Sequence, residues 1–486
     1  MIDDDGLSVL ERYRGFLSAA EMARLVEAVQ RPLSPALRVN TLKIDVDQAR
    51  RLWPEWYGWQ MRPVPFCAAG WQVVGQHPDL GLTLEHKMGF YYVQDAASML
   101  PVELFHFDAV SQPLVLDMAA SPGGKTTHLA CKLKDRGLIV ANDVNTGRIA
   151  ALRSNLQRWG TMATVITHYP GERLGEWFPE CFDKVLLDAP CSGEGLRTAE
   201  RRKSRPLSEK RRRMLHHLQV RLLTRAFQAL KPGGEVVYAT CSLDPDENEA
   251  VLDALLKRYP QQATLEAPAC ALAVPAPGLS SDGAREFHPE IRRAVRLWPH
   301  LYDTAGFCAA LIRKRDSVPV QTGSPPSRPL TQAGLEAMSR QEVTGILDDL
   351  RQAFGFDLGL VLDARALTLW MRGQSVHAIP ELFLSRLADL PCVAMGMLVG
   401  QRSQDGFIPS HELVARFDAQ FTRGRLRLSD EQVKLWLAGR DLRGLGAGRF
   451  PLGAVVVMED DKRRFLGRGK IQRGRIRNLL PRRLIY

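Results

Sequence analysis

The sequence has 486 residues, of which 45% are hydrophobic and 24% are charged, and its formal net charge is +11. This length allows about three domains with cores of their own, and the composition is that of an ordinary globular protein rather than a disordered chain. The positive charge indicates either an anionic partner, most commonly nucleic acid, or simply a solvated basic surface.

The N-terminus, MIDDDGLS, is acidic and lacks the apolar segment of a signal peptide, and no run approaches the roughly 18 apolar residues of a membrane span. The eight cysteines include no Cys-x-x-Cys pair, so neither a zinc site nor a disulfide framework is indicated. We therefore expect a cytoplasmic protein that acts as a monomer and is associated with neither a membrane nor a metal ion.

Residues 1–94 have a mixed pattern. SAAEMARLVEAVQRP has helical spacing, and ALRVNTLKI alternates like a strand. The stretch from Trp53 to Trp71 holds four of the nine tryptophans, which indicates a compact core rather than a linker. We expect an α+β region here.

Residues 95–315 alternate apolar strands with helical segments. The expected strands are PLVLDMAA, GLIVAND, ATVITHY, FDKVLLDAP and GGEVVYATCS, and the expected helices include TGRIAALRSNLQRWG and MLHHLQVRLLTRAFQAL. Nearly continuous apolar strands separated by helices predict an α/β fold with a parallel sheet covered on both faces.

The remaining chain divides at a stretch rich in Pro, Ser and Gly. Residues 316–330, DSVPVQTGSPPSRPL, have the composition of a linker. We expect a small α/β subdomain at 331–395 and a domain of short strands with a basic tail at 396–486.

The segment LDMAASPGGKTTHLA, residues 116–130, carries a loop of small residues between a strand and a helix. A triphosphate-binding loop matches at Gly124-Lys125-Thr126, but its first glycine would fall at Ala119. A dinucleotide-binding loop fits poorly, because Gly123 and Gly124 are adjacent. A third possibility is a cofactor without phosphates, whose carboxylate the first N–H groups of the helix attract.

The next expected strand ends at Asp143, whose carboxylate can accept hydrogen bonds from both hydroxyls of a ribose. S-adenosylmethionine has an amino-acid tail, a ribose and an adenine but no phosphate, so it suits the third possibility. The loop by itself favours this cofactor only modestly over a nucleoside triphosphate.

Two cysteines follow expected strands. LLDAPCSGEG places Asp188 and Cys191 after one strand, and VVYATCSLDPDENE places Cys241 after another. Since ligands bind at the carboxyl ends of strands in an open parallel sheet, both cysteines should lie beside the loop. A single cysteine is more often a small buried hydrophobe, but this pair favours chemistry. Addition of a thiolate to carbon 6 of cytosine makes carbon 5 nucleophilic enough to attack a sulfonium methyl group.

The motifs DMAASPGGKT, LLDAPCSGEG and ATCSLDPDENE, in this order, resemble the Sun/NOL-type RNA cytosine-5 methyltransferases. RVNT and GFYYVQDAASMLP resemble the same family, and the likeness covers roughly residues 35–315. The basic C-terminal extension resembles the RsmF type of bacterial 16S rRNA enzyme, with a PUA-like last domain. The resemblance implies a Rossmann-like class I methyltransferase core between RNA-binding regions.

The resemblance also implies roles for particular residues. Cys241 would be the nucleophile, Cys191 would assist product release as the base for carbon 5, and Asp188 would contact the cytosine near N3 and lie beside the cofactor. Asp143 would bind the ribose. The methionine part would be held by a loop that comprises Ala119, Ala120, Ser121, Pro122, Gly123, Gly124 and Lys125.

One departure from the family pattern concerns THYPGER. Where the family usually has an Asp near the adenine, this sequence has Pro170, which offers neither a carboxylate nor an N–H group. Either a neighbour such as Glu172 substitutes, or backbone and apolar contacts hold the adenine.

Two basic clusters are candidates for RNA contact. Residues 200–213 contain eight Lys or Arg against two Glu, and residues 461–486 contain ten against one Asp. Such runs are usually solvated surface, but the second is interleaved with apolar residues, as in a folded basic surface. The candidates are Arg201, Arg202, Lys203, Arg211, Arg212, Arg468, Lys470, Arg473, Arg475 and Arg477.

These observations favour S-adenosylmethionine-dependent methylation of cytosine carbon 5 in RNA, with 16S rRNA or the small ribosomal subunit as the substrate. The target base has to be unpaired or flipped out, because carbon 6 is hidden inside a helix. Three alternatives remain: a ribosome-assembly factor with little turnover, an RNA-stimulated NTPase, and a methyltransferase acting on another position. The last would leave the two cysteines unexplained.

Overall fold

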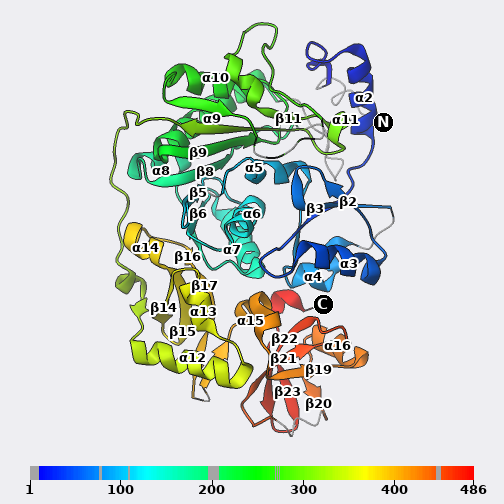
Figure 1. The fold of residues 1–486 in the computed structure, drawn as a ribbon, viewed down its shortest axis with the longest axis vertical. Coiled ribbons are helices and arrows are strands. Elements are labelled where there is room, and N and C mark those ends of the chain that lie inside the picture. The colour runs from blue at the N-terminus through cyan, green and yellow to red at the C-terminus, as the bar shows by residue number, and fades with distance from the viewer. Residues whose placement is uncertain are drawn as a thin grey trace.

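The computed structural model describes residues 10–75, 79–107, 110–194, 207–268, 270, 272, 274–404, 406–444 and 450–485. Four β-sheets follow one another along this part of the chain. Figure 1 shows the largest of them beside the N-terminal region, with the two C-terminal units below. No helix in the described ranges is both long enough and apolar enough to span a membrane.

The N-terminal region is a small α+β unit, as expected. Helix α2 (Ala19–Gln30) begins at a capping box made by Ser18 and Glu21. A four-stranded sheet follows in the order β2 (Gln60–Val64), β3 (Cys67–Val74), β1 (Ala36–Val39) and β4 (Tyr91–Val93). Helix α3 (Val46–Tyr57) covers it, and the tryptophan-rich stretch forms its core.

The central sheet contains the five strands that the sequence predicted. They are β5 (Leu114–Asp117), β6 (Leu138–Asn142), β7 (Thr164–Thr167), β8 (Phe182–Asp188) and β9 (Leu230–Thr240). They pair in parallel in the order β9-β8-β5-β6-β7. Strands β12 (Phe307–Lys314) and β10 (Ala263–Glu266) extend the β9 side in antiparallel pairing.

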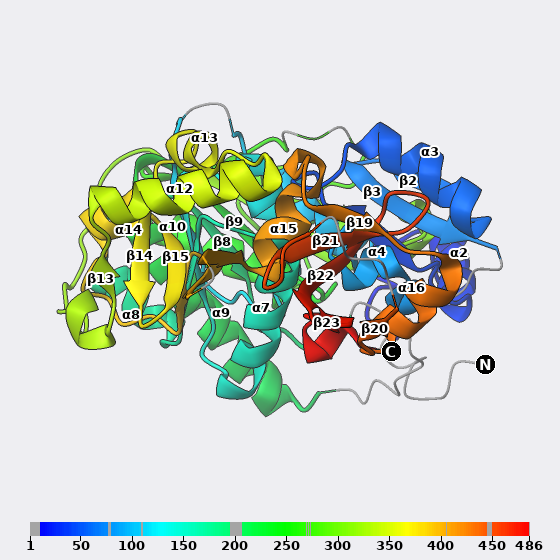
Figure 2. The same cartoon turned by 90° about the horizontal axis from the view of Figure 1, so that it is seen from below.

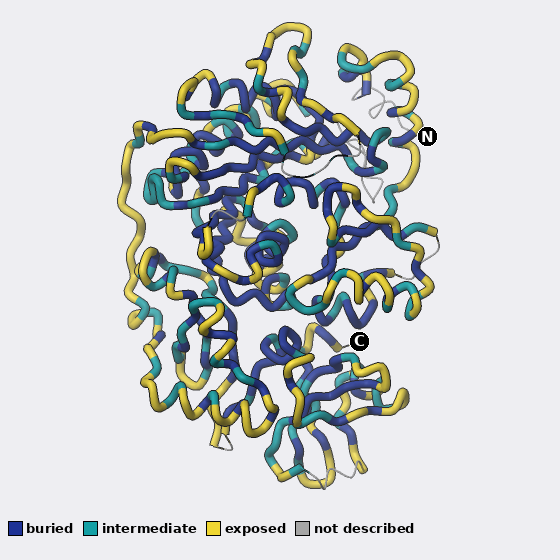
Figure 3. Tube along the Cα trace, in the orientation of Figure 1, coloured by how far each residue is buried: buried dark blue, intermediate teal, exposed yellow. Residues whose placement is uncertain are grey.

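Helices cover both faces of this sheet, so its strands are apolar throughout. One face packs against α8 (Gly171–Trp177), α9 (Glu209–Ala229) and α10 (Glu249–Arg258). The other packs against α5 (Leu100–Glu103), α6 (Gly124–Leu133) and α7 (Thr146–Trp159). Figure 3 shows the strands as the buried centre of this layered unit. The arrangement is the parallel α/β sheet covered on both faces that the sequence pattern predicted, and it agrees with the Rossmann-like core that the family resemblance implies.

A third sheet follows the segment at 316–330, in which no helix or strand begins before Leu330. Its order is β13 (Glu336–Ala337), β14 (Leu367–Arg372), β15 (Ser375–Pro380), β17 (Met397–Ser403) and β18 (Gly406–Pro409), and α12 (Arg340–Phe354) packs on it. Between β15 and β17, the short strand β16 (Ala394–Met395) pairs with β7 and closes that edge of the central sheet.

This sheet corrects the domain boundary expected between residues 395 and 396. Strand β15 pairs with β17 across that boundary, so residues 397–409 belong to the middle subdomain. The sequence pattern could not show this. Short strands lie on either side of Gly396, but their sequences do not indicate that β16 pairs with β7 and β17 with β15.

The C-terminal domain is built on the fourth sheet, in the order β19 (Arg425–Arg427), β21 (Val455–Glu459), β22 (Phe465–Gln472), β23 (Arg475–Asn478) and β20 (Leu442–Arg443). Helix α15 (His411–Phe417) leads into it and α16 (Asp430–Leu437) packs on it. Seen from below, this domain lies against the N-terminal region near α3 and α4 (Leu84–Lys87) (Figure 2).

Candidate active site at the carboxyl ends of the central strands

The loop from Ala119 to Lys125, called here the cofactor loop, connects β5 to α6. Gly123 adopts a φ of 105°, which favours glycine, and a Cβ there would lie 3.1 Å from Leu152 Cδ1. No side chain caps the start of α6, so the first backbone N–H groups of this helix have no side-chain hydrogen-bond partner. Such a helix start attracts a carboxylate.

Arg38 of β1 supports this loop from the N-terminal sheet. Its side chain is fully buried and donates hydrogen bonds to the carbonyl of Gly124 at 2.9 Å and to Thr127 Oγ1 at 2.7 Å. The guanidinium also lies 4.9 Å from the ring centre of Trp159. This contact brings the RVNT segment, which is far away in sequence, against the cofactor loop.

A cavity of about 110 Å³ opens at the cofactor loop. Two of the residues that line it, Gln94 and Asp117, carry buried polar atoms without a hydrogen-bond partner: both amide atoms of Gln94, and Oδ1 of Asp117. Burial raises the pKa of Asp117 to about 7, although Thr126 donates a hydrogen bond to its other oxygen. Sequence reasoning named neither residue as a site residue, although Gln94 lies within the quoted GFYYVQDAASMLP.

Asp143 lies at the end of β6, next to the cofactor loop. Its two carboxylate oxygens accept hydrogen bonds from the backbone N–H groups of Ser121, at 3.0 Å, and Asn145, at 2.8 Å. These bonds fix the carboxylate and leave each oxygen one further lone pair. The neighbouring Val144 is a large apolar side chain that is 62% exposed, which sequence reasoning also missed.

Pro170 is exposed and lies at the N-cap of α8, three residues after the end of β7. Asn142 holds this loop by hydrogen bonds with both the N–H and the carbonyl of Tyr169. Glu172, the possible substitute, is half-buried and its carboxylate lies 3.7 Å from the guanidinium of Arg221 in α9.

The two cysteines lie together where β8 and β9 end. Their sulfur atoms are 3.0 Å apart, with Cys241 exposed and Cys191 half-buried. The hydrogen bond between them lowers the pKa of Cys241 and raises that of Cys191 well above its ordinary value; Lys125 also favours the Cys241 thiolate, and burial further disfavours the Cys191 thiolate. Lys125 Nζ lies 2.6 Å from Asp188 Oδ2, so the cofactor loop contacts the cysteine side directly.

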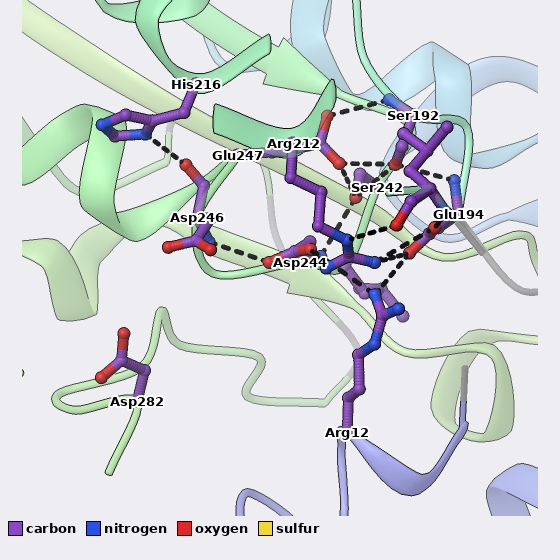
Figure 4. A network of polar contacts seen from close by, with 12 residues as sticks. Arg12, Ser192, Glu194, Arg212, His216, Ser242, Asp244, Asp246, Glu247 and Asp282 are labelled. Carbon is purple, nitrogen blue, oxygen red and sulfur yellow. Dashed lines mark hydrogen bonds and ion pairs between the residues drawn. The ribbon is translucent and has the colours of Figure 1, made fainter. Parts of the chain in front are cut away.

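Glu247 joins the two cysteine loops (Figure 4). Its carboxylate accepts hydrogen bonds from the N–H and hydroxyl of Ser192, at 2.9 and 2.5 Å, and from Ser242 Oγ at 2.8 Å. Gln219 of α9 donates a further bond at 3.0 Å. Since Ser192 follows Cys191 and Ser242 follows Cys241, one side chain holds both loops at a fixed separation.

A second set of charges tethers the N-terminal segment to these loops (Figure 4). Arg12 lies 3.0 Å from Glu194, and Arg212 of α9 lies 3.0 Å from Glu194 and 2.5 Å from Asp244. Glu194 belongs to the Cys191 loop and Asp244 to the Cys241 loop. The side chain of Arg212 is 17% exposed.

The predicted RNA-binding residues divide into three groups. Arg201, Arg202 and Lys203 lie outside the described residues. Arg212 and Arg468 serve internal contacts, and their expected RNA contact is corrected here: Arg212 is held by the carboxylates above, and Arg468 is turned inward to the carbonyls of Pro409 and Leu479. Lys470 is half-buried, and the exposed candidates are Arg211, Arg473, Arg475 and Arg477.

Two clusters in the described chain have side chains of the kinds that bind metals. One consists of Cys67, Glu103 and His128, and the other of His106, Glu235 and Glu266. In each, a protein cation already neutralises a carboxylate: Lys132 lies 2.5 Å from Glu103, and Lys184 lies 2.6 Å from Glu235. These cations disfavour a further positive ion, and the absence of a metal stays a prediction.

Comparison with known families gives three matches along the chain. Residues 106–313 match 16S rRNA methyltransferase RsmB/F, and residues 8–96 match the N-terminal domain of 16S rRNA methyltransferase RsmF. Residues 424–485 match the C-terminal domain of pseudouridine synthase II TruB, in agreement with the expected PUA-like domain.

Relatives and solved structures extend this result. Ribosomal RNA small subunit methyltransferase F of Erwinia tasmaniensis is 34% identical over 96% of this chain and 94% of its own length. The protein of that name from Vibrio cholerae is 32% identical, with coverage of 96% and 94%. A methyltransferase homologue from Pyrococcus horikoshii is 36% identical with a TM-score of 0.53, over 63% of this chain and 99% of the other.

The crystal structure of NSun6 from Pyrococcus horikoshii with SFG supports the fold alone, at 21% identity and a TM-score of 0.54 over 64% of this chain and 98% of the other. The full-length relatives carry the stronger conclusion, because they match the N-terminal region, the sheet with both cysteines and the C-terminal domain together. The chain belongs to the family of ribosomal RNA small subunit methyltransferases F.

Proposed function

We propose that this protein methylates carbon 5 of a cytosine in 16S rRNA with S-adenosylmethionine as the methyl donor. One observation carries the proposal. The sulfur atoms of Cys191 and Cys241 lie 3.0 Å apart beside the cofactor loop, and Lys125 of that loop forms an ion pair with Asp188. The relatives are named for the small-subunit rRNA, and we place the reaction in the bacterial cytoplasm.

The residues around the cavity suit the proposed cofactor. The free N–H groups at the start of α6 suit the carboxylate of an amino acid, and the unpartnered oxygens of Gln94 and Asp117, Oε1 and Oδ1, can accept hydrogen bonds from its ammonium group. Asp143 has lone pairs for ribose hydroxyls, and the exposed Val144 offers an apolar surface for the adenine. When bound, the cofactor supplies an electrophilic methyl group.

The cysteines divide the remaining work. Cys241 attacks carbon 6 of the cytosine as a thiolate, which its lowered pKa favours, and the electron pair of the 5,6 double bond becomes available at carbon 5 for methylation. Cys191, held as a thiol by its raised pKa, is nearby to exchange a proton. Once Cys241 is bonded to carbon 6, its sulfur no longer competes with Cys191 for a proton, so Cys191 can lose its own proton to solvent. As a thiolate, Cys191 then takes the proton from carbon 5, which restores the double bond and expels Cys241 as a thiolate.

Asp188 and Lys125 complete this side of the site. Asp188 is within reach of a cytosine ring that lies against Cys241. The carboxyl group of Asp188 can interact with N3 of that ring as charge develops on it. Lys125, 2.6 Å away, balances the charge of Asp188 and favours the nearby Cys241 thiolate. The base reaches this site only when it is unstacked from its helix, at a cost of a few kcal/mol.

The test combines calorimetry with a transfer assay. The purified protein is titrated with S-adenosylmethionine and, separately, with ATP and Mg²⁺, and then incubated with tritiated donor and either naked 16S rRNA or assembled small subunits. Binding of the methyl donor and appearance of 5-methylcytidine in digested rRNA are expected. Hydrolysis of ATP without methyl transfer would instead support the NTPase, and RNA binding with no transfer would support the assembly factor.

A further inference from the structure

A cleft of about 790 Å³ lies between the N-terminal region and the C-terminal domain, well away from the cysteines. We call it the junction cleft. Its walls come from α3 and the β1–α3 connection on one side and from β19, the α15–β19 connection and the β21–β22 turn on the other. Its volume falls within the roughly 300–1,000 Å³ of pockets that hold organic ligands.

The two domains are fixed to each other at the edge of the junction cleft. Arg464 lies 3.4 Å from Glu85 and donates to Tyr57 Oη at 3.3 Å. Figures 1 and 2 both show α3 and α4 next to the C-terminal sheet. The cleft is therefore a feature of the packed domains and not of either one alone.

Cations outnumber carboxylates in the lining by seven to three. All three carboxylates are engaged by arginines of the same lining: Glu85 by Arg464, Asp418 by Arg425, and Glu459 by Arg425 at 2.6 Å. The surplus charge is consequently not neutralised inside the cleft.

Three of the cations contact no carboxylate at ion-pair distance within the described ranges. Lys462 and Arg463 are exposed in the β21–β22 turn, at the mouth of the cleft. Lys43 lies deeper, where its ammonium donates to the carbonyls of Met88 and Arg158. Arg416 adds a guanidinium whose Nε is buried without a partner and whose nearest carboxylate oxygen, on Asp135, is 3.7 Å away.

Buried or crowded cations without counter-ions are costly, so this lining is suited to an anion that arrives from outside. Aromatic rings lie among them. Trp56 is half-buried, with Lys462 Nζ at 5.6 Å and the Arg464 guanidinium at 5.4 Å from its ring, and Phe90 lies 5.7 Å from Lys43 Nζ. Cations interleaved with flat rings are the arrangement that binds single-stranded nucleic acid, since phosphates pair with the cations and bases stack on the rings.

We propose that the junction cleft binds a single-stranded segment of the rRNA substrate, with its phosphates on Lys462 and Arg463 and a base against Trp56. This inference rests on the proposed function for the identity of the RNA. Lys43 contacts the C-terminal end of α7, whereas Asn145 begins that helix at the cofactor site. Fourteen helical residues span about 21 Å, so the bound segment is remote from the target cytosine.

The test uses the full chain with Lys462→Gln and Arg463→Gln combined, and fluorescein-labelled dodecauridylate as the probe. The matched control is Arg340→Gln with Arg386→Gln, which removes two exposed cations from the middle subdomain. We expect the cleft variant to bind the probe about tenfold more weakly at low salt. The slope of log affinity against log salt should fall by about 1.4, because each single-strand phosphate contact contributes about 0.7.

Trp56→Leu separates stacking from charge. It keeps an apolar side chain but removes the flat ring, so the affinity should fall severalfold while the salt slope stays unchanged. For methyl transfer to 16S rRNA, the cleft variants should raise KM and leave kcat within twofold of wild type, because the cleft is remote from the cysteines. Circular dichroism melting would verify that all variants are folded.

Probe affinity and salt slope equal to those of the control would overturn the proposal. So would a defect confined to assembled subunits with no effect on naked RNA, which would assign the cleft to an acidic protein partner. Failure of the proposed function is a different result: wild type would transfer no methyl group, while the cleft variants would still lose probe affinity.

Discussion

The cofactor loop and the two cysteine loops lie along the same edge of one sheet, but different kinds of contact hold them. In the cofactor loop the groups that are held belong to the main chain: Gly123 makes a left-handed turn, Arg38 binds the carbonyl of Gly124, and Asp143 binds the N–H of Ser121. The cysteine loops are held by side-chain carboxylates, chiefly Glu247. The comparison teaches that the first half of the site should tolerate changes among small residues, such as Ala119 and Ser121, whereas the second depends on single charged groups.

The largest effect is expected at the nucleophile. Cys241→Ala should lower methyl transfer at least about 10⁴-fold, because it removes the thiolate that adds to carbon 6, and the raised pKa of Cys191 makes that thiol a poor replacement. Its affinity for S-adenosylmethionine should stay within a fewfold of wild type, since the cofactor loop is held by separate contacts. Scintillation counting of labelled rRNA and calorimetry measure the two quantities, and normal methylation by this variant would contradict the assignment.

Cys191→Ala should lower turnover by about 10²–10³-fold while leaving attack and methylation possible. Because release is blocked, the protein should accumulate bound covalently to RNA. A band shifted on a denaturing gel, sensitive to ribonuclease and absent from Cys191→Ala/Cys241→Ala, is the expected observation. Absence of the band would mean that the cysteines do not divide attack and release in this way.

Glu247→Gln tests whether the distance between the Cys191 loop and the Cys241 loop affects catalysis. The amide nitrogen cannot accept the hydrogen bonds that a carboxylate oxygen does, so part of the connection between Ser192 and Ser242 is lost. We expect kcat to fall about 10–100-fold with little change in KM, since a shift of 1 Å at reacting groups costs about 100-fold.

Asp246→Asn is the matched control for Glu247→Gln. It changes a half-buried carboxylate in the same motif whose side chain contacts Arg285 instead of the cysteine loops. An equal loss of kcat in both variants, or an equal loss of melting temperature, would indicate a general effect of the motif on folding.

These contrasts also show what the sequence could predict. Strand periodicity and the order of the motifs predicted the central sheet and which loops meet, because parallel strands place their carboxyl ends together. Nothing local could show that Glu247 reaches both Ser192 and Ser242, that Arg38 arrives from another sheet, or that Gln94 faces the cavity. The sequence showed where positive residues occur along the chain but not where their side chains point. Arg468 points inward, and Lys462 lies at a cleft between domains.

Asp117 provides a smaller effect on the cofactor side. Its raised pKa of about 7 means that about half of the free protein carries a proton there at pH 7, and a cationic amino group nearby would favour the ionised form. Binding of S-adenosylmethionine should then release up to about half a proton. Calorimetry in buffers of different ionisation enthalpy measures this release, and Asp117→Asn should abolish it.

The raised pKa of Asp117 also determines how folding stability changes with pH. The folded value lies above the ordinary value of 3.8, so Asp117 stabilises the fold at low pH, and that contribution is lost as the pH rises toward 7 and above. Asp117→Asn should be less dependent on pH over this range. Wild-type proton uptake on cofactor binding, instead of release, would mean that Asp117 does not face the amino group.

The smallest effect is expected from restoring the carboxylate that the family usually has at position 170. Pro170 is exposed at the N-cap of α8, where an Asp is also well suited to the backbone. If the adenine lies against this position, Pro170→Asp gains one hydrogen bond to its amino group, and the Kd for S-adenosylmethionine should fall about three- to tenfold.

Glu172→Gln tests whether Glu172 contacts the adenine in place of the Asp that the family usually has at position 170. Because the Glu172 carboxylate lies near Arg221 of α9, we expect its loss to change the cofactor Kd by less than twofold, which would leave backbone groups and the exposed Val144 to hold the adenine. A tenfold loss would make Glu172 the substitute. Since an Asp N-cap can also stabilise α8, the melting temperature of Pro170→Asp without cofactor must be measured alongside the Kd: a higher melting temperature with an unchanged Kd would mean that the adenine does not contact position 170.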